Sequence, residues 1–72
     1  MEIKLLDVVA LTVDLPKHGL LRGQVGTVVE ILDETENVFE VEFSDNRGVT
    51  YATLPFPANQ LMGLHYELPK TT

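Results

Sequence analysis

Apolar and polar side chains alternate most regularly in one short segment near the middle of the chain. Phe39, Val41 and Phe43 fall on one side of it, and Glu40 and Glu42 fall on the other. A two-residue repeat is typical of a β-strand with one buried face, because successive side chains of a strand point in opposite directions. We therefore predict a strand that buries three large apolar side chains and turns two carboxylates outward.

Four other segments are rich in β-branched and large apolar residues and are bounded by turn-forming residues. Together with the alternating segment they give the predicted strands: residues 5–13, 25–32, 38–43, 49–54 and 62–66. A long loop covers residues 14–24, and a 3₁₀ turn is expected over residues 59–61. Pro55 and Pro57 should end the fourth strand, because proline has no backbone N–H to donate. The pattern predicts an all-β fold, a small five-stranded SH3-like barrel with a long first loop and a 3₁₀ turn before the last strand.

Two glycines, Gly23 and Gly26, lead into the β-branched residues Thr27, Val28 and Val29. Glycine tolerates positive φ and leaves room for a neighbouring backbone, so we expect a bend or a close approach here. We also expect Gly26 not to tolerate a side chain. Val28 and Val29 face opposite ways and both are apolar, so the sequence leaves open which of them points inward.

The expected core draws on the first four strands and the 3₁₀ turn. Its members are Val9, Leu11, Val29, Phe39, Val41, Phe43, Tyr51 and Leu61. Phe56 lies between two prolines that hold the backbone extended. It either plugs the open end of the barrel or stands out as an anchor for a partner. Leu20 and Leu21 pose the same choice, and we expect their loop to fold back on the barrel.

Length and composition limit the class of protein. The 72 residues suffice for one domain, expected over residues 1–66, with a C-terminal tail over residues 67–72. The chain has no cysteine, so it uses neither disulfides nor thiolate metal ligands, which fits a reducing cytoplasm. It shows no signal-peptide pattern and no apolar run near the roughly 20 residues that span a bilayer. We expect a cytoplasmic protein.

The charge balance is acidic, with a net charge of −6. The basic residues are scattered: Lys4, Lys17, Arg22, Arg47 and Lys70. Nucleic-acid binders present a basic face to the phosphates, and anionic membranes attract clustered basic residues. The sequence therefore disfavours nucleic acid and membrane as partners and favours a basic protein.

Residues suited to catalysis or metal binding are sparse. His18 and His65 are the two histidines and lie far apart in the sequence, whereas a metal site needs at least three compatible protein ligands. Ser44, the single serine, precedes Asp45 in a predicted turn, where both suit a turn or cap role. No nucleophile with an adjacent base is recognisable. We expect no enzyme activity, no catalytic or metal-binding residue and no cofactor.

An acidic stripe is the strongest electrostatic feature of the sequence. Its residues lie on the outer face of the third strand and in the turns that flank it: Glu34, Glu36, Glu40, Glu42 and Asp45. Glu30 adds a carboxylate on the strand expected to pair with it. Neighbouring like charges cost a sheet stability, so the stripe is either a docking surface for a basic partner or a solvated face that keeps the protein soluble.

Several segments carry a resemblance to a known family: residues 7–11, 19–20, 23–29, 39–43 and 48–52. On them the chain resembles a family of small bacterial proteins, common in cyanobacteria, known as a domain of unknown function. The resemblance covers about residues 5–66. It implies no established activity, but a neighbourhood of toxin genes among relatives implies an antitoxin or immunity role. The Gly-x-x-Gly-Thr-Val segment also resembles the KOW motif of ribosomal and transcription-associated barrels.

These observations predict a non-catalytic protein-binding module, an antitoxin or immunity-type partner of a basic protein such as a toxin encoded nearby. The predicted partner-binding residues are Glu34, Glu36, Glu40, Glu42, Asp45 and Phe56. The alternative is a nucleic-acid-associated accessory barrel of the KOW type.

Overall fold

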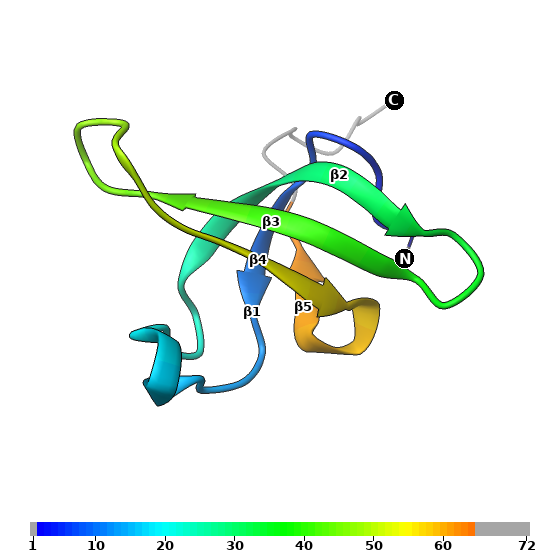
Figure 1. Ribbon diagram of the computed structural model, residues 1–72, viewed down its shortest axis with the longest axis horizontal. Coiled ribbons are helices and arrows are strands. Elements are labelled where there is room, and N and C mark those ends of the chain that lie inside the picture. The colour runs from blue at the N-terminus through cyan, green and yellow to red at the C-terminus, as the bar shows by residue number, and fades with distance from the viewer. Residues whose placement is uncertain (1, 65–72) are drawn as a thin grey trace, which may run out of the picture.

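The computed structural model describes residues 2–64 and is built from β-strands and short 3₁₀ turns (Figure 1). Its elements are β1 (Val8–Leu11), η1 (Pro16–His18), β2 (Val25–Asp33), β3 (Val38–Ser44), β4 (Thr50–Pro57), η2 (Ala58–Gln60) and β5 (Leu61–Gly63). The strands form one antiparallel sheet in the order β4-β3-β2-β1-β5. The predicted all-β class with five strands is confirmed. The sheet is not closed, because β4 and β5 are its two edges. His65, the end of the last predicted strand and the predicted tail lie outside the described residues.

β2 is the longest strand and lies in the middle of the sheet, between β3 and β1. Its first residues pair with β1, and the strand pairs with β3 from Thr27 to Asp33. At Gly26, β2 and β3 lie very close together: a β-carbon built there would lie 2.7 Å from Val41 Cγ1, 2.8 Å from the Glu42 carbonyl oxygen and 2.9 Å from Phe43 Cδ1. The close approach predicted at this glycine is confirmed, and the neighbouring strand causes it.

The first strand is shorter than the predicted segment 5–13. Its N-terminal part is a turn, in which the Asp7 N–H donates to the Lys4 carbonyl (3.1 Å) and the Lys4 N–H donates to Asp7 Oδ2 (2.8 Å). Leu6 takes a φ of 70° in this turn, a conformation that usually favours glycine. A pair of leucines gives no turn signal, which is why the sequence predicted a strand.

The fourth strand runs through both prolines to Pro57, so the prediction that Pro55 ends it is wrong. Because β4 is an edge strand, its backbone donates N–H groups to one neighbour, β3. The positions of Pro55 and Pro57, which lack an N–H, face the open side of the strand, where the missing donors cost little. The 3₁₀ turn begins at Ala58, one residue earlier than predicted.

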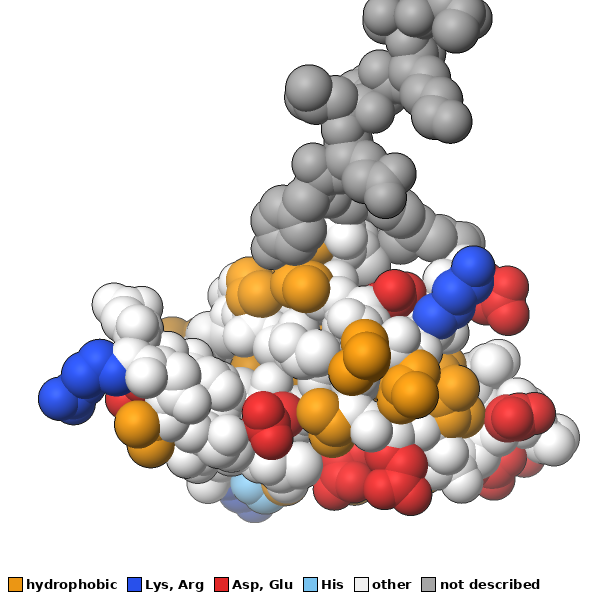
Figure 2. Space-filling view, turned by 90° about the horizontal axis from the view of Figure 1, so that it is seen from above, with side chains coloured by type: hydrophobic (Ala, Val, Ile, Leu, Met, Phe, Trp, Pro, Cys, Tyr) orange, Lys and Arg blue, Asp and Glu red, His pale blue; other side chains and the backbone are white. Residues whose placement is uncertain are grey.

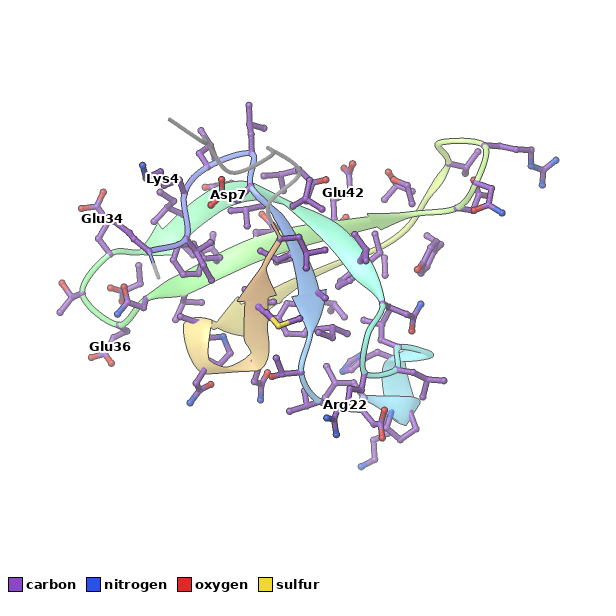
Figure 3. The ribbon with its side chains drawn as sticks, turned by 180° about the vertical axis from the view of Figure 1, so that it is seen from behind. Lys4, Asp7, Arg22, Glu34, Glu36 and Glu42 are labelled. Atoms are coloured by element: carbon purple, nitrogen blue, oxygen red, sulfur yellow. The ribbon has the colours of Figure 1, made fainter. Side chains whose placement is uncertain are left out.

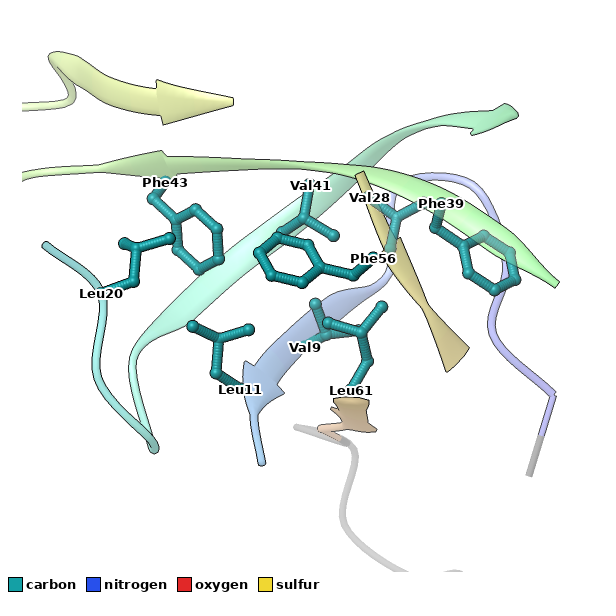
Figure 4. Close-up of a cluster of buried hydrophobic side chains, with 9 residues drawn as sticks. All are labelled: Val9, Leu11, Leu20, Val28, Phe39, Val41, Phe43, Phe56 and Leu61. Carbon is teal, nitrogen blue, oxygen red and sulfur yellow. The ribbon is translucent and has the colours of Figure 1, made fainter. Parts of the chain in front are cut away.

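Nine side chains form the buried core between the curved sheet and the first loop (Figure 4). They are Val9, Leu11, Leu20, Val28, Phe39, Val41, Phe43, Phe56 and Leu61. Two predicted members are wrong. Val29 is 36% exposed because an irregularity between Val28 and Glu30 leaves it as an extra residue, and Val28 faces the core. Tyr51 is 50% exposed because its neighbour Ala52 pairs with the buried Phe43 and packs against the core, so the alternation of the strand turns Tyr51 to the other face.

The first loop folds back on the core, as predicted. Leu15 and Leu20 form a β-bridge around η1, and Gly19 ends η1 with a φ of 70°. This hairpin-like excursion buries Leu20 completely but leaves Leu21 56% exposed. The loop therefore contributes one leucine to the core and leaves the other outside it.

Replacing Gly26 by alanine tests the close approach of β2 and β3. Two side-chain atoms and one backbone oxygen occupy the space of the new methyl group, so the sheet must open. We expect Gly26→Ala to lower the free energy of unfolding by about 1–3 kcal/mol in a urea titration. Val25→Ala, at an exposed neighbour in the same strand, should cost less than about 1 kcal/mol. Equal stability of the two variants would contradict this packing.

Candidate functional site

The outer face of the sheet carries the carboxylates that the alternation of β3 predicts. Glu40 and Glu42 are partly exposed, whereas Phe39, Val41 and Phe43 between and beside them are buried. Their orientation follows from the strand repeat, because the core holds every second residue of β3. The sequence therefore located these two carboxylates correctly.

The register of the sheet brings a third carboxylate to this face. Glu30 of β2 lies directly opposite Glu40 of β3, and Glu42 lies opposite Thr27 two pairs further along, on the same face. On the other side, Glu40 pairs with Pro55 and Glu42 with Thr53. We call Glu30, Glu40 and Glu42 the central acidic cluster. Its nearest strand neighbours carry no positive charge.

Like charges directly opposite each other destabilise a sheet. β2, β3 and β4 contain no lysine or arginine that could compensate them. Figure 2 shows carboxylates and hydrophobic side chains lying together on this face, with the visible lysine and arginine side chains toward its margins. The central acidic cluster is therefore a charged surface without an internal counter-charge from its own strands.

Exposed apolar side chains accompany the carboxylates. Val29 and Leu32 are each the extra residue at an irregularity of β2, and both are exposed. Such mixed apolar and charged surface is typical of protein interfaces, whose cores are apolar and whose rims are polar. The sequence could not locate these residues, because the irregularities change which side chains face the core.

The turn between β2 and β3 displays the next two predicted site residues, Glu34 and Glu36 (Figure 3). Asp33 fixes this turn, since its Oδ1 accepts the N–H groups of Thr35 (2.9 Å) and Glu36 (3.0 Å). Both glutamate side chains are exposed at this end of the sheet. These hydrogen bonds of Asp33 were not predicted from the sequence, although aspartate at the start of a turn often accepts such bonds.

Asp45 lies in the turn at the other end of β3 and stabilises that turn. Its Oδ1 accepts the N–H groups of Arg47 (2.8 Å) and Val49 (3.0 Å). Gly48 completes the turn with a φ of 81°. The predicted acidic site residues thus extend along the whole of β3 and its two turns. Asp45 contributes a carboxylate of which one oxygen is already engaged by the backbone.

Phe56 is part of the core. It is 2% exposed, and its ring meets that of Phe43 edge to face, with the centroids 5.9 Å apart. The sequence left open whether Phe56 fills the interior of the fold or stands out as an anchor for a partner. In the structure Phe56 fills the interior. A shallow depression of about 370 Å³ lies over this region, lined by Leu54, Pro55 and Phe56 together with Leu15 and His18 of the first loop.

A hydrogen-bonded link that the sequence did not reveal joins the first loop to the edge strand β4. Gln24 Nε2 donates to the Tyr51 hydroxyl (2.9 Å), while Gln24 Oε1 accepts the N–H of Leu21. The Tyr51 ring lies 6.4 Å from that of Phe43, measured between centroids. Tyr51 therefore lies over the edge of the core, half exposed, and its hydroxyl holds the loop.

A larger groove of about 580 Å³ lies at the end of the sheet that carries the β2–β3 turn. Its lining comes from the N-terminal segment, β2, the turn, β3 and η2: Glu2, Ile3, Ile31, Glu34, Asn37, Phe39 and Ala58. One of the predicted site residues, Glu34, is thus brought to a cavity.

The described part of the chain, residues 2–64, holds no group of three histidine, cysteine or acidic side chains arranged to bind a metal ion. His18 and Ser44 are both exposed, on η1 and at the end of β3. Over the same residues there is no helix of a length and hydropathy that would cross a bilayer.

Comparison with known proteins places the chain in a family. The family model for a domain of unknown function, DUF4926, matches residues 5–63. The chain belongs to this family. No curated protein and no solved structure matches it. The description of DUF4926 assigns no activity, so any function has to be argued from the surface of the domain.

In this DUF4926 domain, we expect Asp45 to stabilise the fold, independently of any partner that the domain binds. Asp45→Ala leaves the N–H groups of Arg47 and Val49 without their acceptor and should lower the free energy of unfolding by about 1–2 kcal/mol. Asn46→Ala, in the same exposed turn, should change it by less than about 0.5 kcal/mol. Urea titrations of both variants measure this, and a neutral Asp45→Ala would mean that the turn does not depend on the carboxylate.

Proposed function

We propose that this domain is a non-catalytic protein-binding module whose outer sheet face docks a basic protein. The observation that carries the proposal is the direct opposition of Glu30 and Glu40, with Glu42 beside them. No lysine or arginine of β2, β3 or β4 compensates these charges.

The physical reason is a conflict between folding and charge. A like-charged cross-strand pair costs a fraction of a kcal/mol, up to about 1 kcal/mol. Lysine or arginine side chains of a partner would relieve that repulsion, and a net charge of −6 would speed the encounter with a basic surface. Val29 and Leu32 would supply apolar contact beside the charges.

We also propose that the domain is an SH3-like barrel. The strand order β4-β3-β2-β1-β5, with the 3₁₀ turn η2 between the two edge strands, supports an SH3-like barrel that is open between β4 and β5. We further propose an antitoxin or immunity role in the bacterial cytoplasm, with a basic toxin as the partner. This role rests on the family resemblance and on the acidic face. The nucleic-acid alternative would require phosphate contacts, for which β2–β4 provide no cation.

Neutralising two carboxylates tests the proposal. Glu40→Gln with Glu42→Gln removes charge from the central acidic cluster without changing its shape. We expect the double variant to fold with unchanged or slightly higher stability, within about 1 kcal/mol. Its association with the basic protein that co-purifies with the wild type should be slower, with a weaker dependence on salt.

A matched control changes the net charge equally at other places. Asn46→Lys with Asn59→Lys adds two positive charges on the exposed β3–β4 turn and η2. This variant should keep more of the wild-type association rate than the glutamine pair. If the two variants lose the same rate, net charge alone explains binding and the docking face is not on the sheet. Binding of RNA by the wild type at low salt would instead support the nucleic-acid alternative.

A further inference from the structure

The groove at the β2–β3 turn combines an apolar floor with an acidic rim. Phe39 is 5% exposed, and Ile3 and Ala58 pack against the core. Figure 4 shows Phe39 at one end of the core cluster, beside the N-terminal segment. Ile31, opposite Phe39 in the register of β2 and β3, forms an exposed apolar wall. The floor is therefore a continuation of the core that remains open to solvent.

The rim carries two carboxylates from separate segments. Glu2 belongs to the N-terminal segment and Glu34 to the β2–β3 turn, and both are exposed. The turn is held in place by the hydrogen bonds of Asp33 and by the Ala58 N–H, which donates to the Asn37 carbonyl (2.9 Å). Glu34 therefore projects from a turn that is fixed before any ligand arrives, which lowers the entropy cost of binding.

We infer that this groove takes one long basic side chain, lysine or arginine, from the protein partner. Such a side chain has an apolar stem and a charged head, and it buries the stem while keeping the head at a polar rim. The stem would lie on Ile3, Ile31 and Phe39, and the head would reach Glu2 and Glu34. The inference rests on the proposed function and gives the basic partner one defined anchoring point, at the end of the sheet that carries the β2–β3 turn.

Other occupants fit the groove less well. An anionic group would meet two carboxylates. An uncharged aliphatic side chain would fill the floor but would take water from the rim carboxylates without replacing it. Lys4 follows the lining residue Ile3 in the sequence but does not itself line the groove, so it does not occupy the place proposed for the partner's basic side chain. A second copy of this chain would bring another net charge of −6.

Titration of the ¹⁵N-labelled full chain with short capped peptides tests the inference. The probes are acetyl-Gly-Arg-Gly-amide and its lysine equivalent, with norleucine and citrulline peptides as probes that keep the stem but lack the charge. The basic peptides should shift the amide signals of Ile3, Ile31, Glu34 and Phe39, with a dissociation constant of about 1 mM or weaker, as befits a single side chain. The uncharged peptides should shift them much less.

Two variants of the same turn identify the rim. Glu34→Gln should weaken binding of the arginine peptide about threefold, since it removes one exposed charge pair. Glu36→Gln, which removes a carboxylate that does not line the groove, should leave binding within about twofold. Equal effects of the two variants would overturn the inference, because they would mean that only general charge attracts the peptide.

Three further results would overturn the inference. They are norleucine binding as tightly as arginine, shifts that map to Glu30, Glu40 and Glu42 instead of the groove, and the absence of any shift. None of these results decides the proposed function, which is tested separately by the association of the Glu40→Gln with Glu42→Gln variant with a protein partner. Conversely, arginine-specific shifts in the groove, together with partner binding that does not depend on the β3 carboxylates, would support the groove as a binding site. The same result would contradict the proposal that the outer sheet face docks the partner.

Discussion

The missing side chain at Gly26 is the constraint on which the rest of this small sheet depends. β3 lies so close to β2 at this point that Val41 and Phe43 occupy the space of a β-carbon. The contact sets β3 against β2, and Phe43 packs in the core against Phe56. A domain of this size has a small core, so each contact of this kind is a large part of its stability. The missing side chain at Gly26 therefore lets the buried face of β3 lie directly against β2.

The same constraint determines the charged surface. Once Val41 and Phe43 point inward, strand geometry turns Glu40 and Glu42 outward, and the register places Glu30 opposite Glu40. The protein accepts a like-charge pair on a sheet whose total stability is modest. Surfaces that serve binding often reduce stability in this way, because the groups that attract a partner repel one another in the free protein. This conflict is the physical basis for regarding the face as a docking surface.

Much of this arrangement was predictable from the sequence, and the exceptions have definite causes. Strict alternation predicted the faces of β3, and the glycine before a β-branched run predicted the close approach at Gly26. The inward residue of β2 was not predictable, because Val28 and Val29 are both apolar and only the pairing of Val28 with the buried Val41 decides between them. The extension of β4 through Pro55 was missed because a sequence does not reveal which strands are edges.

The groove was missed for a related reason. Its walls come from the N-terminal segment, β2, the β2–β3 turn and η2, and long-range packing alone brings them together. Leu6 adopts positive φ in the turn that leads into β1, and no sequence signal announces it. Glu34 was recognised as a member of an acidic stripe, but its apolar surroundings, Ile3 and Ile31, were visible only in the folded chain.

Carboxylate footprinting of the complex tests whether the outer face of the sheet docks the basic partner. The domain and the basic protein identified as co-purifying with it are treated with a carbodiimide and an amine label, and modification is read by mass spectrometry with and without the partner. We expect Glu30, Glu40 and Glu42 to lose labelling in the complex, while Asp14, on the first loop, keeps it. Equal labelling of the three glutamates in the free and bound domain would contradict a docking role for the outer face of the sheet.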